Sequence, residues 1–274
     1  MNVKKEEKTL ISVVMPVYNA EDHLEESIES ILSQSFENFE FIIIDDCSED
    51  NSKEIIDKYR SKDKRIKLLR NEENKGATYS INKGIKKAKG KYIARMDADD
   101  ISKKERLEKQ YEFMEENEEV AALGTKAWNI NEEGEKTNKR NVPETNEEIM
   151  NIITLMCPMI HPSVMLRKEK IEEVGLYNED LRKAQDYDLW FRLAAKGYKM
   201  HNLQERLLLY RLEKGRSFKD RITETKIKWK GYKKLGIPIH KRYGIFIHLT
   251  LGLIPNFIMK KVYNKLRKFD PRER

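Results

Sequence analysis

The chain has 274 residues, with 54 Lys and Arg against 47 Asp and Glu, which gives a formal net charge of +7. This length suits one large domain or two closely packed ones, and it is sufficient to bury a hydrophobic core. Its two cysteines, Cys47 and Cys157, exclude a disulfide scaffold and a cysteine-rich zinc module, and they indicate a reducing compartment.

In chain order, a polar N-terminal extension over residues 1–9 lacks the apolar core of a signal peptide. Apolar, β-branched runs then alternate with segments of helical periodicity. The runs predict strands at Leu10–Val17, Phe39–Ile44, Ile66–Leu69 and Lys91–Met96, and the first two are predicted to be buried. The periodic segments predict helices at Glu21–Ser33, Ser52–Tyr59 and Gly76–Ala88. This alternation predicts an α/β fold with a mostly parallel, doubly wound, Rossmann-like sheet flanked by helices.

The second half of the chain continues less regularly. Helical spacing predicts helices at Lys103–Glu116 and Asp186–Lys196, and apolar runs predict strands at Val120–Trp128 and Ser163–Arg167. The stretch Asn129–Asn146 is charged and is predicted to be rich in loops. In doubly wound sheets, ligands bind beyond the carboxyl ends of the strands, so the residues that follow the predicted strands are candidate site residues.

Asp97, Asp99 and Asp100 follow the fourth predicted strand. Three carboxylates within four residues repel one another unless a cation lies between them, and such hard oxygen ligands favour Mg²⁺ or Mn²⁺. The alternative is an acidic turn in which Asp100 or Ser102 caps the next helix.

Asp45 and Asp46 follow the second predicted strand. A carboxylate there can accept hydrogen bonds from a nucleobase imide or a ribose. Alternatively, Asp46, Ser48 or Asp50 caps the following helix.

Other candidates lie further along the chain. Gly76, two residues after Asn74, permits close backbone approach at a helix N-terminus, where phosphate is favoured. Asp186 is either a general base beside the diphosphate or a cap of its own helix. His161 and His201 are candidates for substrate or metal contact, or are structural.

Taken in order, these segments resemble the family 2 glycosyltransferases, which have the GT-A fold. The resemblance covers about residues 10–215. It rests on Pro16-Val17-Tyr18-Asn19, Ile44-Asp45-Asp46-Cys47-Ser48-Glu49-Asp50, Asn74-x-Gly76, Ala94-Arg95-Met96-Asp97-Ala98-Asp99-Asp100 and Gln185-Asp186-Tyr187-Asp188-Leu189-Trp190. It implies one glycosyltransferase domain over residues 10–220, with a nucleotide-binding half to residue 100 and an acceptor half after it.

The resemblance also implies roles for single residues. Tyr18 would pack on uracil, Asp45 would hold the imide edge of the base, and Asp97 would contact the ribose. Asp99 would ligate the metal that bridges the phosphates, and Asp186 would deprotonate the acceptor hydroxyl. The full nucleotide-binding set implied is Pro16, Tyr18, Asn19, Asp45, Asp46, Asn74, Gly76 and Asp97. Family members usually invert the anomeric carbon, and most use UDP-sugars.

Two positions depart from the family pattern. Gln185 precedes Asp186 where relatives often have Glu. Glu213 stands in the stretch after Tyr210-Arg211, where many relatives carry a His that can join the metal. Either Glu213 would replace this ligand beside Asp97 and Asp99, or the metal would rely on Asp99 and waters. Lys214 and Arg216 would help to neutralise the diphosphate.

The basic character of the chain lies in its C-terminal region. Residues 221–274 hold 15 Lys and Arg against 3 Asp and Glu, whereas residues 1–220 hold 39 against 44. The apolar stretch Tyr243–Met259 is too short to span a membrane, and with its basic flanks it is typical of an interfacial helix on anionic lipid. Alternatively, its apolar part packs on the domain. Because the candidate site is acidic, a nucleic-acid partner is not expected.

These features together predict an inverting, metal-dependent transfer of a sugar from a nucleotide-sugar to a cell-surface glycan or lipid-linked acceptor. The expected location is cytoplasmic or peripheral on the inner face of the plasma membrane. One alternative is a nucleotidyltransferase, which would release pyrophosphate rather than a nucleoside diphosphate. A second is a non-catalytic nucleotide-sugar-binding module on the membrane.

Overall fold

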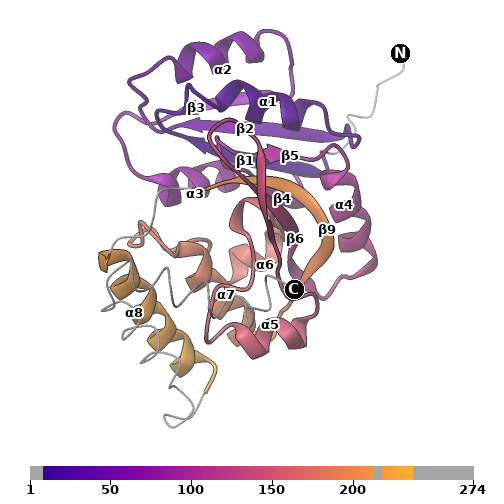
Figure 1. Ribbon diagram of the computed structural model, residues 1–274, viewed down its shortest axis with the longest axis vertical. Coiled ribbons are helices and arrows are strands. Elements are labelled where there is room, and N and C mark those ends of the chain that lie inside the picture. The colour runs from indigo at the N-terminus through magenta and orange to yellow at the C-terminus, as the bar shows by residue number, and fades with distance from the viewer. Residues whose placement is uncertain (1–8, 213–217, 237–274) are drawn as a thin grey trace, which may run out of the picture.

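The computed structural model describes residues 9–212 and 218–236 of the chain. Within these residues, nine strands form one sheet in the order β3-β2-β1-β4-β8-β6-β9-β5, with β7 paired to β6 outside this path (Figure 1). The strands are β1 Ile11–Val17, β2 Phe39–Asp45, β3 Ile66–Arg70, β4 Tyr92–Arg95, β5 Ile101–Ser102, β6 Val120–Ile130, β7 Lys136–Arg140, β8 Met165–Arg167 and β9 Lys199–Arg211. The helices are α1 Leu24–Leu32, α2 Ser52–Arg60, α3 Ala77–Lys87, α4 Arg106–Glu116, α5 Asn146–Ile152, α6 Lys168–Glu173, α7 Gln185–Ala195 and α8 Phe218–Lys234.

The first half of the sheet is parallel, as predicted. β1 pairs with both β2 and β4, and β2 pairs with β3. Helices α1 and α2 cover one face and α3 covers the other (Figure 1). Val13 and Met15 belong to the core cluster on the α1 side, whereas Val14, Ile42 and Ile44 pack with residues of α3. Because both faces are buried, these strands are continuous apolar runs, and this pattern made them predictable.

The second half of the sheet is mixed. β8 pairs antiparallel with β4 and β6, β6 runs parallel to β9, and β5 pairs antiparallel with β9. The long β9 curves across the molecule (Figure 1). The predicted strands at Val120–Trp128 and Ser163–Arg167 are present as β6 and β8, and the predicted helices are present as α4 and α7.

Two predictions for this half are wrong. The stretch Asn129–Asn146, predicted to be rich in loops and without a strand, contains β7, because its exposed residues hydrogen-bond to the edge of β6. The helix predicted from Lys103 begins at Arg106, since Ile101–Ser102 pair with β9 instead. Neither Asp100 nor Ser102 caps it: the N-cap residue is Glu105, and it makes no side-chain capping bond.

Helix α8 crosses the predicted boundary between residues 220 and 221. It packs on α7, and Lys228 Nζ donates to the carbonyl of Leu155 (2.7 Å). The apolar segment Tyr243–Met259 and the rest of residues 237–274 lie outside the described residues, as do residues 1–8. In the part of the chain that the structure describes, no helix has the length and apolar character needed to cross a bilayer.

Gly84 allows α3 to approach the sheet closely. A Cβ atom at this position would lie 2.6 Å from Val14 Cγ1 and 2.8 Å from Ile44 Cδ1. Overpacking costs about 1–3 kcal/mol, more than the gain of about 1 kcal/mol in helix propensity. We therefore expect Gly84→Ala to lower the free energy of unfolding in urea. Lys87→Ala, on the exposed side of the same helix, is the control and should change it by less than about 0.5 kcal/mol. Equal unfolding midpoints would contradict this packing.

Candidate functional site

The segments that follow β1, β2 and β4 meet at one edge of the sheet. The backbone N–H of Asp46 donates to the carbonyl of Val17 (2.8 Å), and that of Asn19 donates to Ser48 Oγ (3.1 Å). Ser27 of α1 donates its hydroxyl to the carbonyls of Ala98 (2.8 Å) and Asp100 (2.7 Å). Three segments that are distant in sequence therefore form one surface, as parallel strands with a common direction require.

The segment after β1 offers one exposed aromatic ring. Tyr18 is 46 % exposed, and Asn19 beside it has a positive φ of 47°. The Asn19 Oδ1 accepts the backbone N–H of Glu49 (2.9 Å), which fixes the turn. Pro16 is buried in β1 and pairs with β2 beyond the part of β1 that pairs with β4. Among Pro16, Tyr18 and Asn19, Tyr18 offers an exposed aromatic ring on which a planar base can stack.

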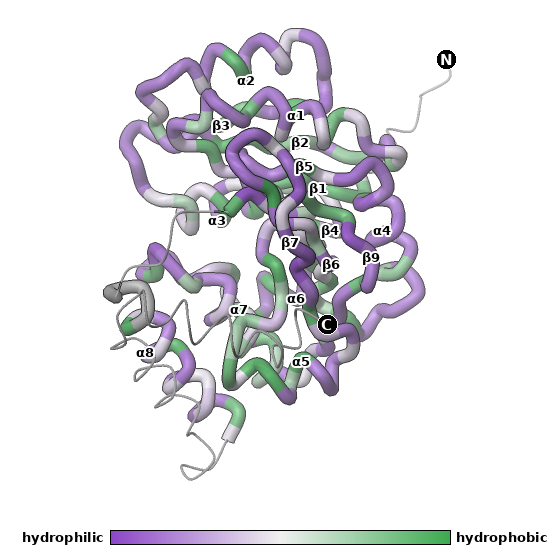
Figure 2. Tube along the Cα trace, viewed as in Figure 1, coloured by the Kyte–Doolittle hydropathy of each residue, from purple (hydrophilic) through white to green (hydrophobic). Residues whose placement is uncertain are grey.

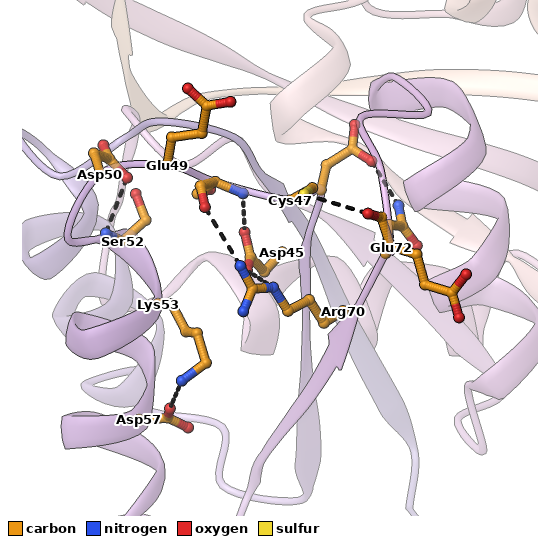
Figure 3. A network of polar contacts seen from close by, with 12 residues as sticks. Asp45, Cys47, Glu49, Asp50, Ser52, Lys53, Asp57, Arg70 and Glu72 are labelled. Carbon is orange, nitrogen blue, oxygen red and sulfur yellow. Dashed lines mark hydrogen bonds and ion pairs between the residues drawn. The ribbon is translucent and has the colours of Figure 1, made fainter.

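Asp45, the last residue of β2, is fully buried. Its Oδ1 accepts the backbone N–H of Ser48 (2.9 Å), and its Oδ2 lies 3.1 Å from Nε of Arg70 on β3. Figure 3 shows the Arg70 side chain reaching across to Asp45. The Oδ2 atom has no aligned hydrogen-bond donor despite this ion pair, so one buried acceptor site remains open.

Asp46 organises the loop that leads into α3. Its Oδ1 accepts from Asn71 Nδ2 (2.6 Å) and from the backbone N–H of Lys75 (3.0 Å), and its Oδ2 accepts from that of Gly76 (2.7 Å). Gly76 has a φ of 89° and is the N-cap residue of α3. Asn74, in the loop between Asn71 and Gly76, is exposed. Asp46 therefore holds the loop before α3 rather than capping α2, where the Asp50 side chain accepts the backbone N–H of Ser52 (3.0 Å).

Asp97, Asp99 and Asp100 form an acidic cluster after β4. One carboxylate oxygen of each lies within 4.8 Å of the others. Burial raises the pKa of the Asp100 carboxyl well above its usual range, and the charges of Asp97 and Asp99 raise it further. Asp100 Oδ2 is buried without a hydrogen-bond partner. Three mutually repelling hard oxygen donors, one of them with an open buried acceptor atom, fit a divalent cation such as Mg²⁺ or Mn²⁺.

Arg211, the last residue of β9, ties the acidic cluster to the neighbouring elements. Its backbone N–H donates to Asp100 Oδ1 (2.8 Å), and its Nε donates to the carbonyl of Asp99 (2.9 Å). Its Nη1 donates to the carbonyls of Asn131 (2.6 Å) and Glu132 (2.7 Å), in the turn between β6 and β7. One side chain thus fixes the cluster against the β6–β7 hairpin.

Two further arginines lie behind the acidic cluster. The buried Arg95 side chain pairs with Asp97. Arg106 of α4 is fully buried and donates to the carbonyl of Pro162 (2.8 Å). Burial lowers the pKa of Arg106 to about 10, and the negative charge of Asp100 opposes this shift. The positive charges of Arg95 and Arg106 partly neutralise the negative charge of the acidic cluster.

Asp186 lies in the first turn of α7 and does not cap it. The N-cap residue is Ala184, which has a positive φ of 58° and makes no side-chain capping bond. Cys157 Sγ is 3.4 Å from Asp186 Oδ2. The hydroxyl of Tyr177 lies within electrostatic reach of both Asp186 and Asp97, although burial is the main reason why its pKa is raised. Asp186 and the acidic cluster therefore act on a common neighbour.

His161 contacts the side chains of Tyr177 and Trp190. Its Nε2 is 2.9 Å from the hydroxyl of Tyr177, and burial lowers the pKa of His161 well below its usual range. Below about pH 6.5 the imidazole of His161 is protonated in the unfolded state but stays neutral in the folded state. The folded state is therefore stabilised fully above this pH and loses stability as the pH falls.

We therefore expect the unfolding free energy to decline less between pH 7 and pH 5 in His161→Gln than in the wild type. Gln can still hydrogen-bond to the Tyr177 hydroxyl, so the two proteins differ mainly in the titrating group. Each pH unit below the unfolded value costs up to about 1.4 kcal/mol in the wild type alone. Urea unfolding at both pH values measures the difference, and equal declines would show that His161 is not the group responsible.

The remaining predicted contacts divide into two groups. His201 stacks on Phe113, with ring centroids 4.6 Å apart, which supports a structural role. Glu213, Lys214 and Arg216 lie outside the described residues, so their predicted contacts with metal or diphosphate stay predictions.

Comparison with known proteins identifies relatives of the whole domain. Residues 12–175 match the family described as glycosyl transferase family 2. An uncharacterised glycosyltransferase of Methanocaldococcus jannaschii is 38 % identical over 270 residues, covering 93 % of this chain and 92 % of that protein. A putative teichuronic acid biosynthesis glycosyltransferase of Bacillus subtilis, TuaG, is 33 % identical and covers 83 % of this chain and 89 % of its own.

Solved structures show the same fold. The S. aureus protein TarS matches with a TM-score of 0.69 at 22 % identity, over 89 % of this chain and 43 % of the TarS chain. The mannosyltransferase PcManGT from Pyrobaculum calidifontis, solved with GDP-Man and Mn²⁺, matches with a TM-score of 0.65 at 15 % identity, over 97 % of this chain and 83 % of its own. The predicted GT-A fold is thereby confirmed.

Proposed function

Because the chain belongs to glycosyl transferase family 2 and is a glycosyltransferase, we propose that it moves a sugar from a UDP-sugar to an acceptor hydroxyl, with divalent metal and with inversion. The observation that carries this proposal is the acidic cluster of Asp97, Asp99 and Asp100 at the carboxyl edge of the sheet. In such a sheet, this edge is where ligands bind. An acidic surface can hold an anionic diphosphate only if a cation offsets its charge.

Asp97 and Asp99 hold the metal in this proposal, and Asp100 is available as a third ligand through its open Oδ2. When bound, Mn²⁺ or Mg²⁺ supplies the positive charge that stabilises the diphosphate as it leaves. Arg211 and Arg95 keep the carboxylates in place, since they bond to the Asp99 backbone and to the Asp97 side chain. Glu213 remains a further candidate ligand.

The nucleoside lies on the surface formed after β1 and β2. The exposed ring of Tyr18 packs on the uracil. Asp45 is fully buried and paired with Arg70, so Arg70 moves aside before Asp45 Oδ2 accepts the imide N–H of the base. Asp97 contacts the ribose, and the loop of Asn74 and Gly76, held by Asp46, lies beside the base. TarS has been solved with UDP and with UDP-GlcNAc, which supports a uridine donor.

Asp186 is the general base. It accepts the proton of the acceptor hydroxyl while that oxygen attacks the anomeric carbon from the face opposite the diphosphate, and this direction of attack inverts the configuration. The contact with Cys157 holds Asp186 Oδ2, so the carboxylate has a fixed orientation. Asp186 lies inside the first turn of α7, and the N-cap residue of this helix is Ala184.

The acceptor is a growing cell-surface glycan or a lipid-linked sugar on the cytoplasmic face of the membrane. The name of TuaG, which refers to teichuronic acid biosynthesis, supports a polysaccharide product. The net charge of residues 221–274, with 15 Lys and Arg against 3 Asp and Glu, supports contact with anionic lipid. Deleting residues 241–274 should then abolish salt-sensitive binding to vesicles of anionic lipid, and undiminished binding would contradict this contact.

The proposed reaction is tested by the nucleotide that it releases. A panel of UDP-sugars is incubated with the protein, Mn²⁺ and a mixture of soluble glycan and lipid-linked acceptors, and the nucleotide products are separated by ion-exchange chromatography. The proposal requires UDP from at least one donor, and no UDP in the presence of a chelator. Pyrophosphate release from a nucleoside triphosphate and a sugar phosphate would instead identify a nucleotidyltransferase.

A further inference from the structure

A group of positive side chains surrounds Trp128, outside the site described above. Three cations lie over its indole ring: Lys136 at 5.4 Å, Lys139 at 5.9 Å and Arg206 at 5.4 Å from the ring centroid. Lys126 lies on the same strand as Trp128, and it is paired with Arg206 in the register of β6 and β9. We call Trp128, Lys126, Lys136, Lys139 and Arg206 the basic cluster.

Within residues 9–212 and 218–236, the cations of the basic cluster lack carboxylate partners. Among the described residues, none of the four forms an ion pair, although Glu144 and Glu148 are within electrostatic reach of Lys126. Arg206 Nε is buried without a hydrogen-bond acceptor. Burial and the charge of Arg206 lower the pKa of Lys126, so these like charges crowd one another.

Some other cations over aromatic rings in this chain pair with carboxylates. Lys58 over Tyr59 pairs with Glu25 (2.6 Å), and Arg65 over Phe39 pairs with Asp63 (2.7 Å). Trp128 differs from the other rings in the described part of the chain because three cations lie over it, and none of these three forms an ion pair there. Unpaired like charges around a ring favour an anion in the same way that the acidic cluster favours a cation.

The basic cluster lies beside the proposed reaction site. Ile130 pairs with Arg211, whose backbone bonds to Asp100 of the acidic cluster. Trp128 comes two residues before Ile130 in β6, and two residues of a strand span about 7 Å. Lys136 and Lys139 belong to β7, whose trace is hydrophilic (Figure 2). A polymer whose end is at the acidic cluster can extend over this hairpin.

We propose that the basic cluster binds acidic sugar units of the acceptor, which makes the acceptor a glycan that carries carboxylate or phosphate groups. This inference rests on the proposed function and names the substrate class of the same site. The acidic groups of the sugars pair with the Lys and Arg side chains that lie over the half-buried indole of Trp128. A neutral glycan would leave these cations unpaired.

The test compares binding of polygalacturonate, which has one carboxylate per sugar, with binding of neutral dextran to the full chain. We expect the wild type to bind only the acidic polymer, and Lys136→Gln/Lys139→Gln to weaken this binding about tenfold, since two charge-assisted contacts with the polymer are lost. The matched control is Lys58→Gln/Lys62→Gln, which removes two cations from over the Tyr59 ring and should leave binding within about twofold. Equal affinities for the wild type and the β7 variant would overturn the proposal.

A site-resolved measurement separates the basic cluster from the basic C-terminal region. Acetylation of lysines, followed by mass spectrometry, should show Lys126, Lys136 and Lys139 protected by polygalacturonate and Lys62 unprotected. Protection by vesicles of phosphatidylglycerol but not by the polymer would assign this surface to a membrane and overturn the proposal. Calorimetric UDP binding is measured in the same variants: a loss of UDP affinity in the β7 variant would place the cluster in the donor site and also overturn it. Absence of UDP binding in the wild type would instead count against the proposed function.

Discussion

Asp186→Asn is expected to reduce sugar transfer by about 10²–10⁴-fold, the usual contribution of a general base. The side chains are nearly equal in size, so the loss reflects the missing proton acceptor rather than a change in packing. Binding of UDP with Mn²⁺ should be unchanged, because Asp186 faces the acceptor hydroxyl in this mechanism. Initial rates at saturating donor and calorimetric binding of UDP measure the two quantities separately.

Asp188→Asn is the matched control for this prediction. It also removes one negative charge from the first turn of α7, so both variants lose the same interaction with the helix dipole. Asp188 pairs with Arg192 (2.7 Å), and we expect its loss to reduce stability while the rate stays within a few-fold of the wild type. Wild-type turnover by Asp186→Asn, or equal losses in both variants, would remove Asp186 from the role of base.

Asp99→Ala is expected to abolish the metal-dependent part of nucleotide binding. One of three neighbouring carboxylates is lost, and even outer-shell partners of a metal are typically worth 10–100-fold in affinity, so we expect a loss of about 100-fold or more in Mn²⁺ affinity. The repulsion that raises the pKa of Asp100 also decreases, so the remaining pair attracts a cation less strongly. Calorimetric titration of UDP with and without Mn²⁺ measures the effect.

Asp57→Ala is a suitable control for the loss of a carboxylate. Asp57 is on α2, where it pairs with Lys53 (2.9 Å) on the surface. Metal-dependent binding of UDP should be unaffected by this change, since a surface ion pair contributes little. If Asp99→Ala retains wild-type affinity for UDP in the presence of Mn²⁺, the acidic cluster is not the metal site.

The first half of the fold was predictable because three of its strands, β1, β2 and β4, are buried on both faces. Continuous runs such as Leu10–Val17 and Phe39–Ile44 have few other structures available to them, and their ends placed Asp45 and Asp97 at the sheet edge. The strand β7 was not predictable, since its sequence Lys-Thr-Asn-Lys-Arg has no apolar alternation. It is a strand only because the edge of β6 offers it hydrogen bonds.

The carboxylates of the candidate site were predictable, but the arginine side chains around them were not. Asp97, Asp99 and Asp100 are close in sequence, so their crowding follows from spacing alone. Arg211 meets Asp100 across more than a hundred residues, and Arg106 lies on a helix where a charged residue normally indicates a solvated face. Such contacts depend on the tertiary fold, and no local pattern in the sequence indicates them.

The central claim is that the carboxyl edge of the sheet binds a nucleoside diphosphate through a divalent ion. Calorimetric titration of the wild-type chain with UDP, in Mn²⁺ and then in a chelator, tests it without knowledge of the sugar or the acceptor. The account predicts binding of UDP in Mn²⁺ and its loss in the chelator. Equal binding in both conditions, or no binding in either, would contradict it.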